Sequence, residues 1–278
     1  MSFNKLCRIY LVITLQMLVA GCASMRHSIF EYAEESGNDT LMRATAHLTP
    51  RQEHFLGRSI LARVVTDRNP VPSERLQLYV NKIGQYLSLH SQRPTTYNGY
   101  RFVVIDDPAQ TALSMPGGFV AISSGMLRTV ENEDELAAVL AHEIAHIAAR
   151  HAEKNIKTEN RLALGQKILT AISQMVPDRK ALEIFGEAVV TGLEVPFNKI
   201  QEREADADAV SILHSAGYDP KALMRVIERI PKTATLFSKH SRNESRLSAL
   251  EKQTSGYSNT ISKQGLVRFR TEMNPPQG

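Results

Sequence analysis

The chain has 278 residues, 42% of them hydrophobic and 22% charged, which is ordinary for a globular protein with one large domain or two small ones. Its formal charge is +4, and it falls to +2 when Lys5 and Arg8 near the start are left out. So small an excess gives no argument for nucleic-acid binding, and we expect no nucleic acid among the partners.

The first 21 residues have the proportions of a secretory signal peptide. Lys5 and Arg8 form a short basic start, and an apolar run from Ile9 to Ala20 follows. The run is too short for a membrane-spanning helix, which needs roughly 20 residues. We therefore expect residues 1–21 to be removed from the mature protein.

The end of this run resembles a bacterial lipobox, because Leu18-Val19-Ala20-Gly21 precedes Cys22. Processing would leave Cys22 as a lipid-bearing first residue; the alternative is an ordinary signal peptide with a chance cysteine. Residue 23 is Ala rather than Asp, which by the usual sorting pattern indicates the outer membrane. The sequence thus predicts a lipoprotein anchored at Cys22, facing the periplasm and without an internal disulfide.

The rest of the chain predicts a mainly helical α+β domain. Residues 22–50 are polar and read as a tether, and helical periodicity over 51–89 is interrupted by Pro70 and Pro72, which separate two helices. Two β-like runs, Tyr100–Ile105 and Gly118–Ser123, predict a small antiparallel sheet.

Beyond the second run the pattern is helical to about Lys252. The sequence predicts a folded domain over residues 51–253 and a flexible C-terminal tail over 254–278.

One predicted helix carries a metal-binding motif. Asn132 can cap its first turn, with Glu135 three residues later, and an apolar face follows. Within it, His142 and His146 are four residues apart, so that two imidazoles reach one ion from the same face. This arrangement predicts one zinc ion per chain.

Glu143 follows the first histidine and would touch a water on the metal without being a ligand. Zinc lowers the pKa of such a water towards about 7, and a carboxylate can then take its proton and later deliver it to a leaving amine. The residues therefore predict a zinc-dependent peptidase.

A catalytic zinc needs a third protein ligand, and spacing alone leaves its identity open. His151 stands about 140° around the helix from His146, so we interpret it as a surface or packing histidine. A glutamate with an aspartate one turn later is the common alternative. Both Glu202 with Asp206 and Glu204 with Asp208 satisfy that spacing, on nearly opposite faces.

The stretch from Asn132 to His146, followed by Ala149-Arg150-His151, resembles the core of the minigluzincin zinc metalloproteases, the Ste-type and HtpX-like family. The resemblance covers about residues 76–250 and implies a zincin-like metalloprotease domain. No apolar run after residue 20 is long enough to span a membrane. Within the family the chain is therefore most similar to the periplasmic outer-membrane lipoprotein proteases, a group that includes LoiP and BepA.

The resemblance also implies roles for residues outside the motif. The family's Glu-x-x-Ala-Asp motif matches Glu202 as third ligand and Asp206 as its orienting partner. His240 and Arg246 correspond to a downstream His and Arg near the metal, as catalytic residues, although Ser241 stands where Pro is usual.

Residues 111–118 are similar to a stretch that precedes the family's substrate-pairing edge strand, with Thr111 for Asn and Leu113 for Phe. The resemblance then implies substrate binding by Gly117, Gly118, Phe119, Val120 and Ala121.

The favoured function is an endopeptidase of envelope quality control that cuts misfolded or misassembled envelope proteins, with the outer-membrane assembly machinery as a candidate partner. The first alternative is an outer-membrane protein assembly factor or chaperone, with a structural or occluded zinc site. The second is a metal-dependent hydrolase of other substrates.

Overall fold

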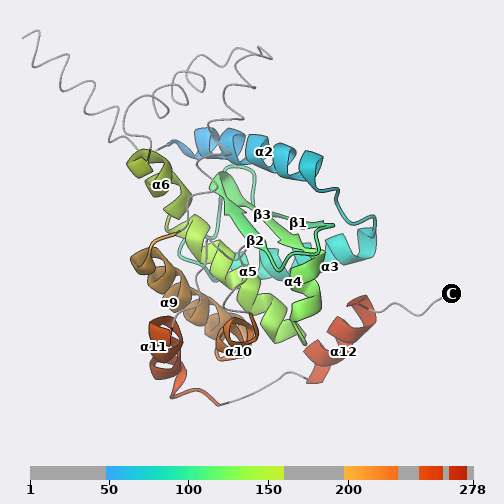
Figure 1. Ribbon diagram of the computed structural model, residues 1–278, viewed down its shortest axis with the longest axis vertical. Helices are drawn as coiled ribbons and strands as arrows, with labels where there is room; N and C mark the ends of the chain where they lie inside the picture. The colour runs from blue at the N-terminus through green and yellow to red at the C-terminus, as the bar shows by residue number, and fades with distance from the viewer. Residues whose placement is uncertain (1–47, 160–196, 231–243, 259–262, 274–278) are drawn as a thin grey trace, which may run out of the picture. The chain divides into compact units, whose positions relative to one another are not determined.

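The computed structural model describes residues 48–159, 197–230, 244–258 and 263–273. The predicted signal peptide, most of the tether with Cys22, and His240 lie outside these ranges. Within them the chain is mainly helical with one small sheet (Figure 1), which confirms the predicted α+β class. None of the helices in the described ranges combines the length and apolarity that crossing a membrane requires.

The helices and strands keep the labels of Figure 1. They are α2 (Pro50–Asp67), α3 (Glu74–Ser88), β1 (Arg101–Ile105), β2 (Ala112–Met115), η1 (Pro116–Gly118), β3 (Phe119–Ser123), α4 (Ser124–Thr129), α5 (Glu133–Ala148), α6 (His151–Glu159), α9 (Lys199–Ala216), α10 (Ala222–Arg229), α11 (Glu244–Thr254) and α12 (Lys263–Met273).

Local sequence signals explain where several helices begin and end. Thr49 caps α2 and Asn198 caps α9, each in a reciprocal capping box with the residue three positions later. Gly217 ends α9 in the left-handed conformation, at φ 80°. As predicted, Pro70 and Pro72 lie between two helices, α2 and α3.

The sheet has the order β1-β3-β2 and is mixed rather than antiparallel, so the predicted antiparallel sheet was wrong. β2 and β3 form an antiparallel hairpin around η1, whereas β1 pairs with β3 in parallel. The sequence had indicated only the segments that form β1 and β3. The strand β2, which lies between them in the sequence, reverses the chain direction once more, so that β3 runs parallel to β1. As a result β3 lies in the centre of the sheet with partners on both sides.

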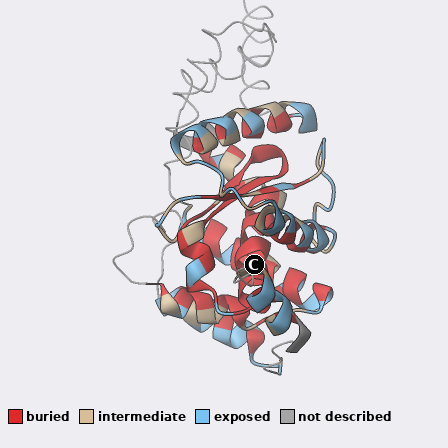
Figure 2. Cartoon of the chain, turned by 90° about the vertical axis from the view of Figure 1, so that its right-hand side faces the viewer, coloured by how far each residue is buried: buried red, intermediate tan, exposed pale blue. Residues whose placement is uncertain are grey.

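The sheet is covered on both faces (Figure 1). On β3, Val120 and Ile122 belong to the main core with α3, α5, α9 and α10, whereas Phe119 and Ala121 pack with the apolar side of α2. Figure 2 shows α5 buried along almost its whole length in the middle of the described helices. The helix that carries the metal-binding motif is therefore a central element of the fold.

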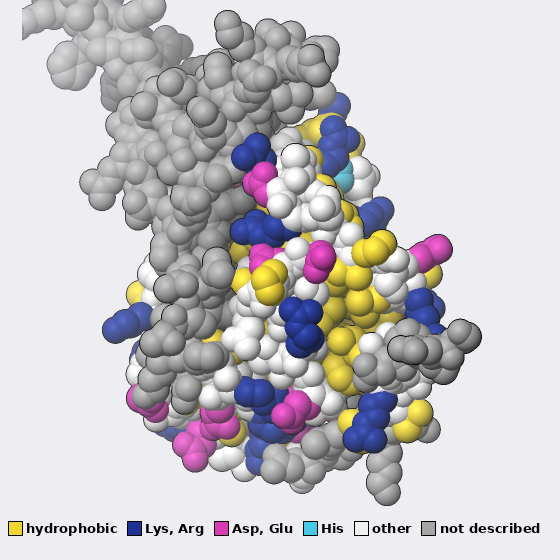
Figure 3. All heavy atoms as spheres, turned by 45° about the vertical axis from the view of Figure 1, so that its right-hand side comes forward, with side chains coloured by type: hydrophobic (Ala, Val, Ile, Leu, Met, Phe, Trp, Pro, Cys, Tyr) yellow, Lys and Arg dark blue, Asp and Glu magenta, His cyan; other side chains and the backbone are white. Residues whose placement is uncertain are grey.

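The surface carries charges of both signs. On the face in Figure 3, basic and acidic side chains are interspersed around an area of hydrophobic ones. The large apolar side chains that remain exposed include Leu78 and Tyr86 on α3 and Leu89 directly after it.

The C-terminal segment, for which the sequence predicts a flexible tail, contains helix α12. Phe269 of this helix is buried in the main core, and Arg268 forms an ion pair with Glu133 of α5. The contact between Arg268 and Glu133 joins residues 135 positions apart, and a local sequence pattern does not indicate it.

Candidate active site

The N-terminal end of α5 is anchored by three consecutive buried acids. Glu133 accepts a hydrogen bond from the Tyr79 hydroxyl at 2.9 Å, and Asp134 accepts one from the backbone N–H of Asp219 at 3.1 Å. Glu135 forms an ion pair with Arg229 of α10 at 2.7 Å. Each acid thus ties the helix to a different part of the chain, which fixes the position of the motif further along.

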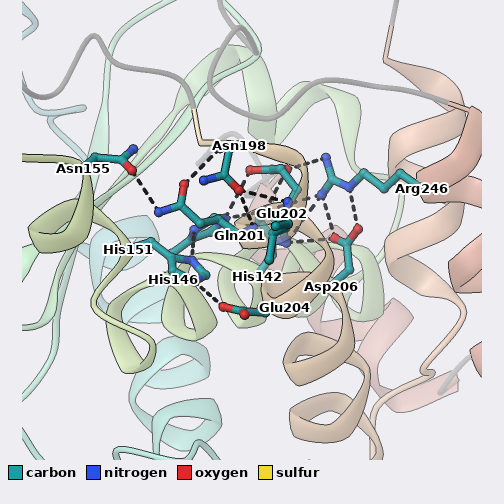
Figure 4. A network of polar contacts seen from close by, with 11 residues as sticks. His142, His146, His151, Asn155, Asn198, Gln201, Glu202, Glu204, Asp206 and Arg246 are labelled. Carbon is teal, nitrogen blue, oxygen red and sulfur yellow. Dashed lines mark hydrogen bonds and ion pairs between the residues drawn. The ribbon is translucent and has the colours of Figure 1, made fainter. Parts of the chain in front are cut away.

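His142, His146 and Glu202 converge on one point between α5 and α9 (Figure 4). Their nearest donor atoms all lie within 4.8 Å of one another, and all three residues are buried. Nε2 of His146 is 3.1 Å from Nε2 of His142 and 3.4 Å from Oε1 of Glu202. Donors bound about 2.0–2.1 Å from a tetrahedral ion are roughly 3.3 Å apart, so this set fits one zinc ion and leaves one coordination position.

The structure places Glu202 and Glu204 in different surroundings. Glu202 is almost fully buried beside both histidines, whereas the side chain of Glu204 is 52% exposed and contacts His151 instead. Asp208, the second member of the other pair, accepts a hydrogen bond from Gln92 on the surface. Of the two pairs that the spacing allowed, only Glu202 with Asp206 directly contacts the two histidines of the motif on α5.

Asp206 and Arg246 support the donor set from behind. Oδ1 of Asp206 lies 3.1 Å from Nδ1 of His142, the nitrogen that faces away from the other donors. Arg246, from α11, is 2.6 Å from Asp206 through Nε and 2.8 Å from Oε2 of Glu202 through NH1. Burial raises the pKa of the Asp206 carboxyl, but Arg246 and His142 outweigh that effect and hold it below its usual value.

Arg246 therefore contacts both Glu202, one of the three donors, and Asp206, which contacts the donor His142. The resemblance implied that it is near the metal site, and the structure places it there, buried between α9 and α11. His240, its expected partner, lies outside the described residues.

His151 is buried, and its interpretation as a surface or packing histidine was incomplete. Its Nδ1 is 2.8 Å from Nδ1 of His146, and its Nε2 is 3.0 Å from Oε2 of Glu204. The angular argument assumed a continuous helix, but α5 ends at Ala148 and Arg150 adopts φ 56°, which turns His151 back towards His146. No Gly or Pro marks this break, so the sequence held no signal for it.

Phe197 is a second residue that the sequence did not single out. Its ring stacks on that of His146, with the ring centroids 4.0 Å apart and the planes at 20°. It immediately precedes Asn198, the cap of α9, so the start of that helix also confines the imidazole.

Glu143 lies on α5 directly after His142 and is buried. A small pocket opens beside His146. Its lining comes from η1, the end of β2, the end of α5, the start of α6 and α2, and it includes Ser114, Met115, Gly117 and Ile147.

β3, which the resemblance implied to be an edge strand that pairs with substrate, is the central strand of the sheet. Phe119, Val120 and Ala121 belong to β3, whose two edges are both hydrogen-bonded within the sheet, and only Gly117 of the predicted set lines the pocket. Within the described residues the outer strand on this side is β2, and Ser114 and Met115 of β2 line the pocket beside His146.

Comparisons with known proteins give matches to one protein family and to several of its members. The model of the family described as peptidase family M48 matches residues 74–254. The beta-barrel assembly-enhancing protease of Yersinia pestis is 28% identical over 222 residues, which are 74% of this chain and 44% of that protein. Its namesake in Escherichia coli K12 is 28% identical over 193 residues, 62% of this chain and 37% of the relative.

The mitochondrial metalloendopeptidase OMA1 of Schizosaccharomyces pombe is 31% identical over 159 residues, 53% of this chain and 44% of that protein. The chain thus spans less than half the length of these relatives.

Proposed function

The chain belongs to peptidase family M48, and we propose that it is a zinc-dependent endopeptidase that cuts misfolded or misassembled proteins of the bacterial envelope. The observation that carries the proposal is the convergence of His142 and His146 from α5 with Glu202 from α9. Two imidazoles and one carboxylate with an open position are the donor set of catalytic zinc in peptidases.

In this proposal Glu143 is the general base and acid. A zinc ion held by His142, His146 and Glu202 would supply a Lewis acid and would lower the pKa of a water towards about 7. The Glu143 carboxylate takes a proton from the attacking water and returns it to the nitrogen of the leaving amine. Asp206 keeps His142 in the orientation that points Nε2 at the donor set, and Arg246 balances the charge of Glu202 and Asp206.

We place the substrate on β2 rather than on β3. An extended peptide that adds to the outer side of β2 gains backbone hydrogen bonds with little dependence on sequence. Two features support this position: β2 is the outer strand within the described residues, and its end lines the pocket beside His146. Unfolded segments meet this requirement, because their backbone groups are available for pairing.

The envelope setting rests on two supports. The signal-like start and the lipobox indicate a lipid anchor at Cys22 in the outer membrane, with the domain in the periplasm. Two of the relatives are named beta-barrel assembly-enhancing proteases, which suggests substrates and partners in outer-membrane protein assembly.

The same names favour a second function. A protein that enhances assembly can act as an assembly factor or chaperone, with its zinc site structural or occluded. The burial of His142, Glu143 and His146 agrees with a site that opens only when a substrate is present.

The decisive experiment compares protein without its signal peptide, its Glu143→Gln variant and a chelated sample on an unfolded β-barrel protein. We expect Glu143→Gln to bind a full equivalent of zinc but to cut about 10²–10⁴-fold more slowly. Glu251→Gln, an exposed glutamate on α11, is the matched control and should cut at the wild-type rate.

Equal cleavage by wild type and Glu143→Gln would refute the protease proposal. Rescue of envelope assembly by Glu143→Gln in cells that lack the protein would establish the chaperone function instead of, or beside, proteolysis.

A further inference from the structure

The metal-site histidine His146 is held from behind by a second histidine and a carboxylate. We propose that His151 and Glu204 are positioning residues that keep the His146 imidazole in the tautomer that presents Nε2 to the metal. This inference rests on the proposed function, because it concerns the same zinc site.

The three residues form a chain of short contacts (Figure 4). Nδ1 of His146 is 2.8 Å from Nδ1 of His151, and Nε2 of His151 is 3.0 Å from Oε2 of Glu204. His151 is fully buried, so both of its ring nitrogens are removed from water and both have a partner. A histidine that only fills space would not need a carboxylate on its far nitrogen.

The chemistry of the contacts fixes where each proton lies. An ionised carboxylate can only accept, so His151 donates to Glu204 from Nε2. A neutral His151 then has its lone pair on Nδ1 and can only accept from His146. His146 must therefore carry its proton on Nδ1, which leaves the Nε2 lone pair facing His142 and Glu202.

The opposite assignment would disable the site. If His151 donated from Nδ1, His146 would carry its proton on Nε2, 3.4 Å from Oε1 of Glu202, and no lone pair would face the metal position. Glu204 selects between the two states because it accepts but cannot donate.

Helix α9 serves both ligand histidines in this way. Asp206 contacts His142 directly, and Glu204 reaches His146 through His151. Ligating histidines commonly give their other N–H to a carboxylate or a backbone carbonyl, which orients the ring. Glu204 lies on the exposed side of α9, and His151 bridges the gap between its carboxylate and the His146 ring.

The turn between α5 and α6 delivers His151 to this position. Arg150 holds φ 56° while its guanidinium pairs with the buried Glu53 of α2 at 3.1 Å. Gln201 of α9 donates to Asn155 of α6 at 2.8 Å, which keeps α6 against α9. These contacts stabilise the left-handed backbone conformation of Arg150, which is energetically unfavourable for a non-glycine residue.

The test measures zinc affinity by chelator competition in full-length mature protein, without reference to cleavage. His151→Phe removes both contacts and Glu204→Gln removes the acceptor-only group. We expect both to bind zinc about 10–100-fold more weakly. His151→Gln, whose amide oxygen can accept from His146, should recover part of the loss. Asp208→Asn, which alters a carboxylate one turn along α9, should leave the affinity unchanged.

A spectroscopic readout separates positioning from folding. In the cobalt-substituted protein each ligating imidazole gives an exchangeable N–H proton resonance. We expect the His146 signal to disappear or shift in His151→Phe and to shift in Glu204→Gln, with that of His142 retained. Glu204 is half-exposed, so Glu204→Gln provides a test even if His151→Phe fails to fold.

The outcomes distinguish this inference from the proposed function. Zinc affinities within twofold of wild type in both Glu204→Gln and His151→Phe, with unchanged N–H resonances, would overturn the positioning role and leave the zinc peptidase intact. A wild-type protein that binds no stoichiometric zinc would overturn both.

Discussion

Three buried charged side chains meet at the candidate metal site. Glu202 and Asp206 lie one turn apart on α9, and the guanidinium of Arg246 contacts both. Two carboxylates in a buried site repel each other and lose hydration, and a planar guanidinium can offset both effects through several hydrogen bonds. Arg246 therefore stabilises the close approach of the proposed ligand Glu202 and the proposed orienting residue Asp206.

Replacement of Arg246 should weaken folding. Arg246→Met leaves two buried carboxylates without their cation, and we expect the free energy of unfolding of the metal-free protein to fall by about 3–5 kcal/mol. Arg246→Lys keeps the charge but not the fork that reaches both acids, so the loss should be smaller. Urea unfolding measures the free energy of unfolding of both variants in the metal-free form.

Arg203→Lys is the control, because this arginine of α9 is exposed, and its change should stay within about 0.5 kcal/mol. An unchanged unfolding free energy in Arg246→Met would contradict the assignment.

At the scale of elements, the N-terminal end of α5 is held by residues from distant parts of the chain. Its first turn carries Glu133, Asp134 and Glu135, whose charges suit the positive end of the helix dipole. The structure adds partners from α3, α10 and α12, so the acids are anchors as well as dipole partners. The position of the zinc donors at the other end of α5 depends on these anchors.

The Glu135–Arg229 pair predicts a pH dependence of stability. Burial raises the pKa of the Glu135 carboxyl, but hydrogen bonds from Arg229 and the backbone N–H of Glu131 lower it to below its usual value of 4.5. A folded-state pKa below the unfolded one stabilises the fold above about pH 4.5, and this contribution is lost as the pH falls through the folded-state pKa.

Arg229→Gln should lower the unfolding free energy at pH 7 by about 1–3 kcal/mol and make its decline in acid shallower. Urea unfolding of metal-free protein between pH 7 and about pH 3 tests this, since release of bound zinc in acid then plays no part and the other titrating groups are the same in both proteins. Arg128→Gln, an exposed arginine of α4, should keep the wild-type profile. Parallel profiles for Arg229→Gln and wild type would refute the prediction.

At the scale of the whole molecule, the sequence predicted features that depend on neighbouring residues and missed those that depend on contacts between distant segments. Capping residues and apolar periodicity predicted α5 correctly, and Pro70 with Pro72 predicted a helix boundary. The parallel pairing of β1 with β3 joins segments across an intervening strand, so no local pattern specified it. The packing of α12 likewise depends on Glu133, far away in the chain.

In the candidate site, too, the local features were predicted from the sequence and the long-range ones were not. The spacing of His142 and His146 is a property of one helix and predicted a metal site from the sequence. Spacing could not choose between Glu202 and Glu204, because that choice depends on how α9 faces α5. The role of His151 depends on a left-handed turn at Arg150, which the residue types did not reveal.

Metal removal should destabilise the whole domain, because the zinc donors join its two most extensively packed helices, α5 and α9. A ligand that binds only the folded state, at 1,000 times its Kd, stabilises it by about 4 kcal/mol. For a domain of this size that corresponds to a fall in Tm of roughly 8–16 °C on chelation. Glu143→Gln should show the same fall, since it keeps every donor. Glu202→Gln, which loses a donor, should melt lower and respond little to chelator; a wild-type response in that variant would exclude Glu202 as a ligand.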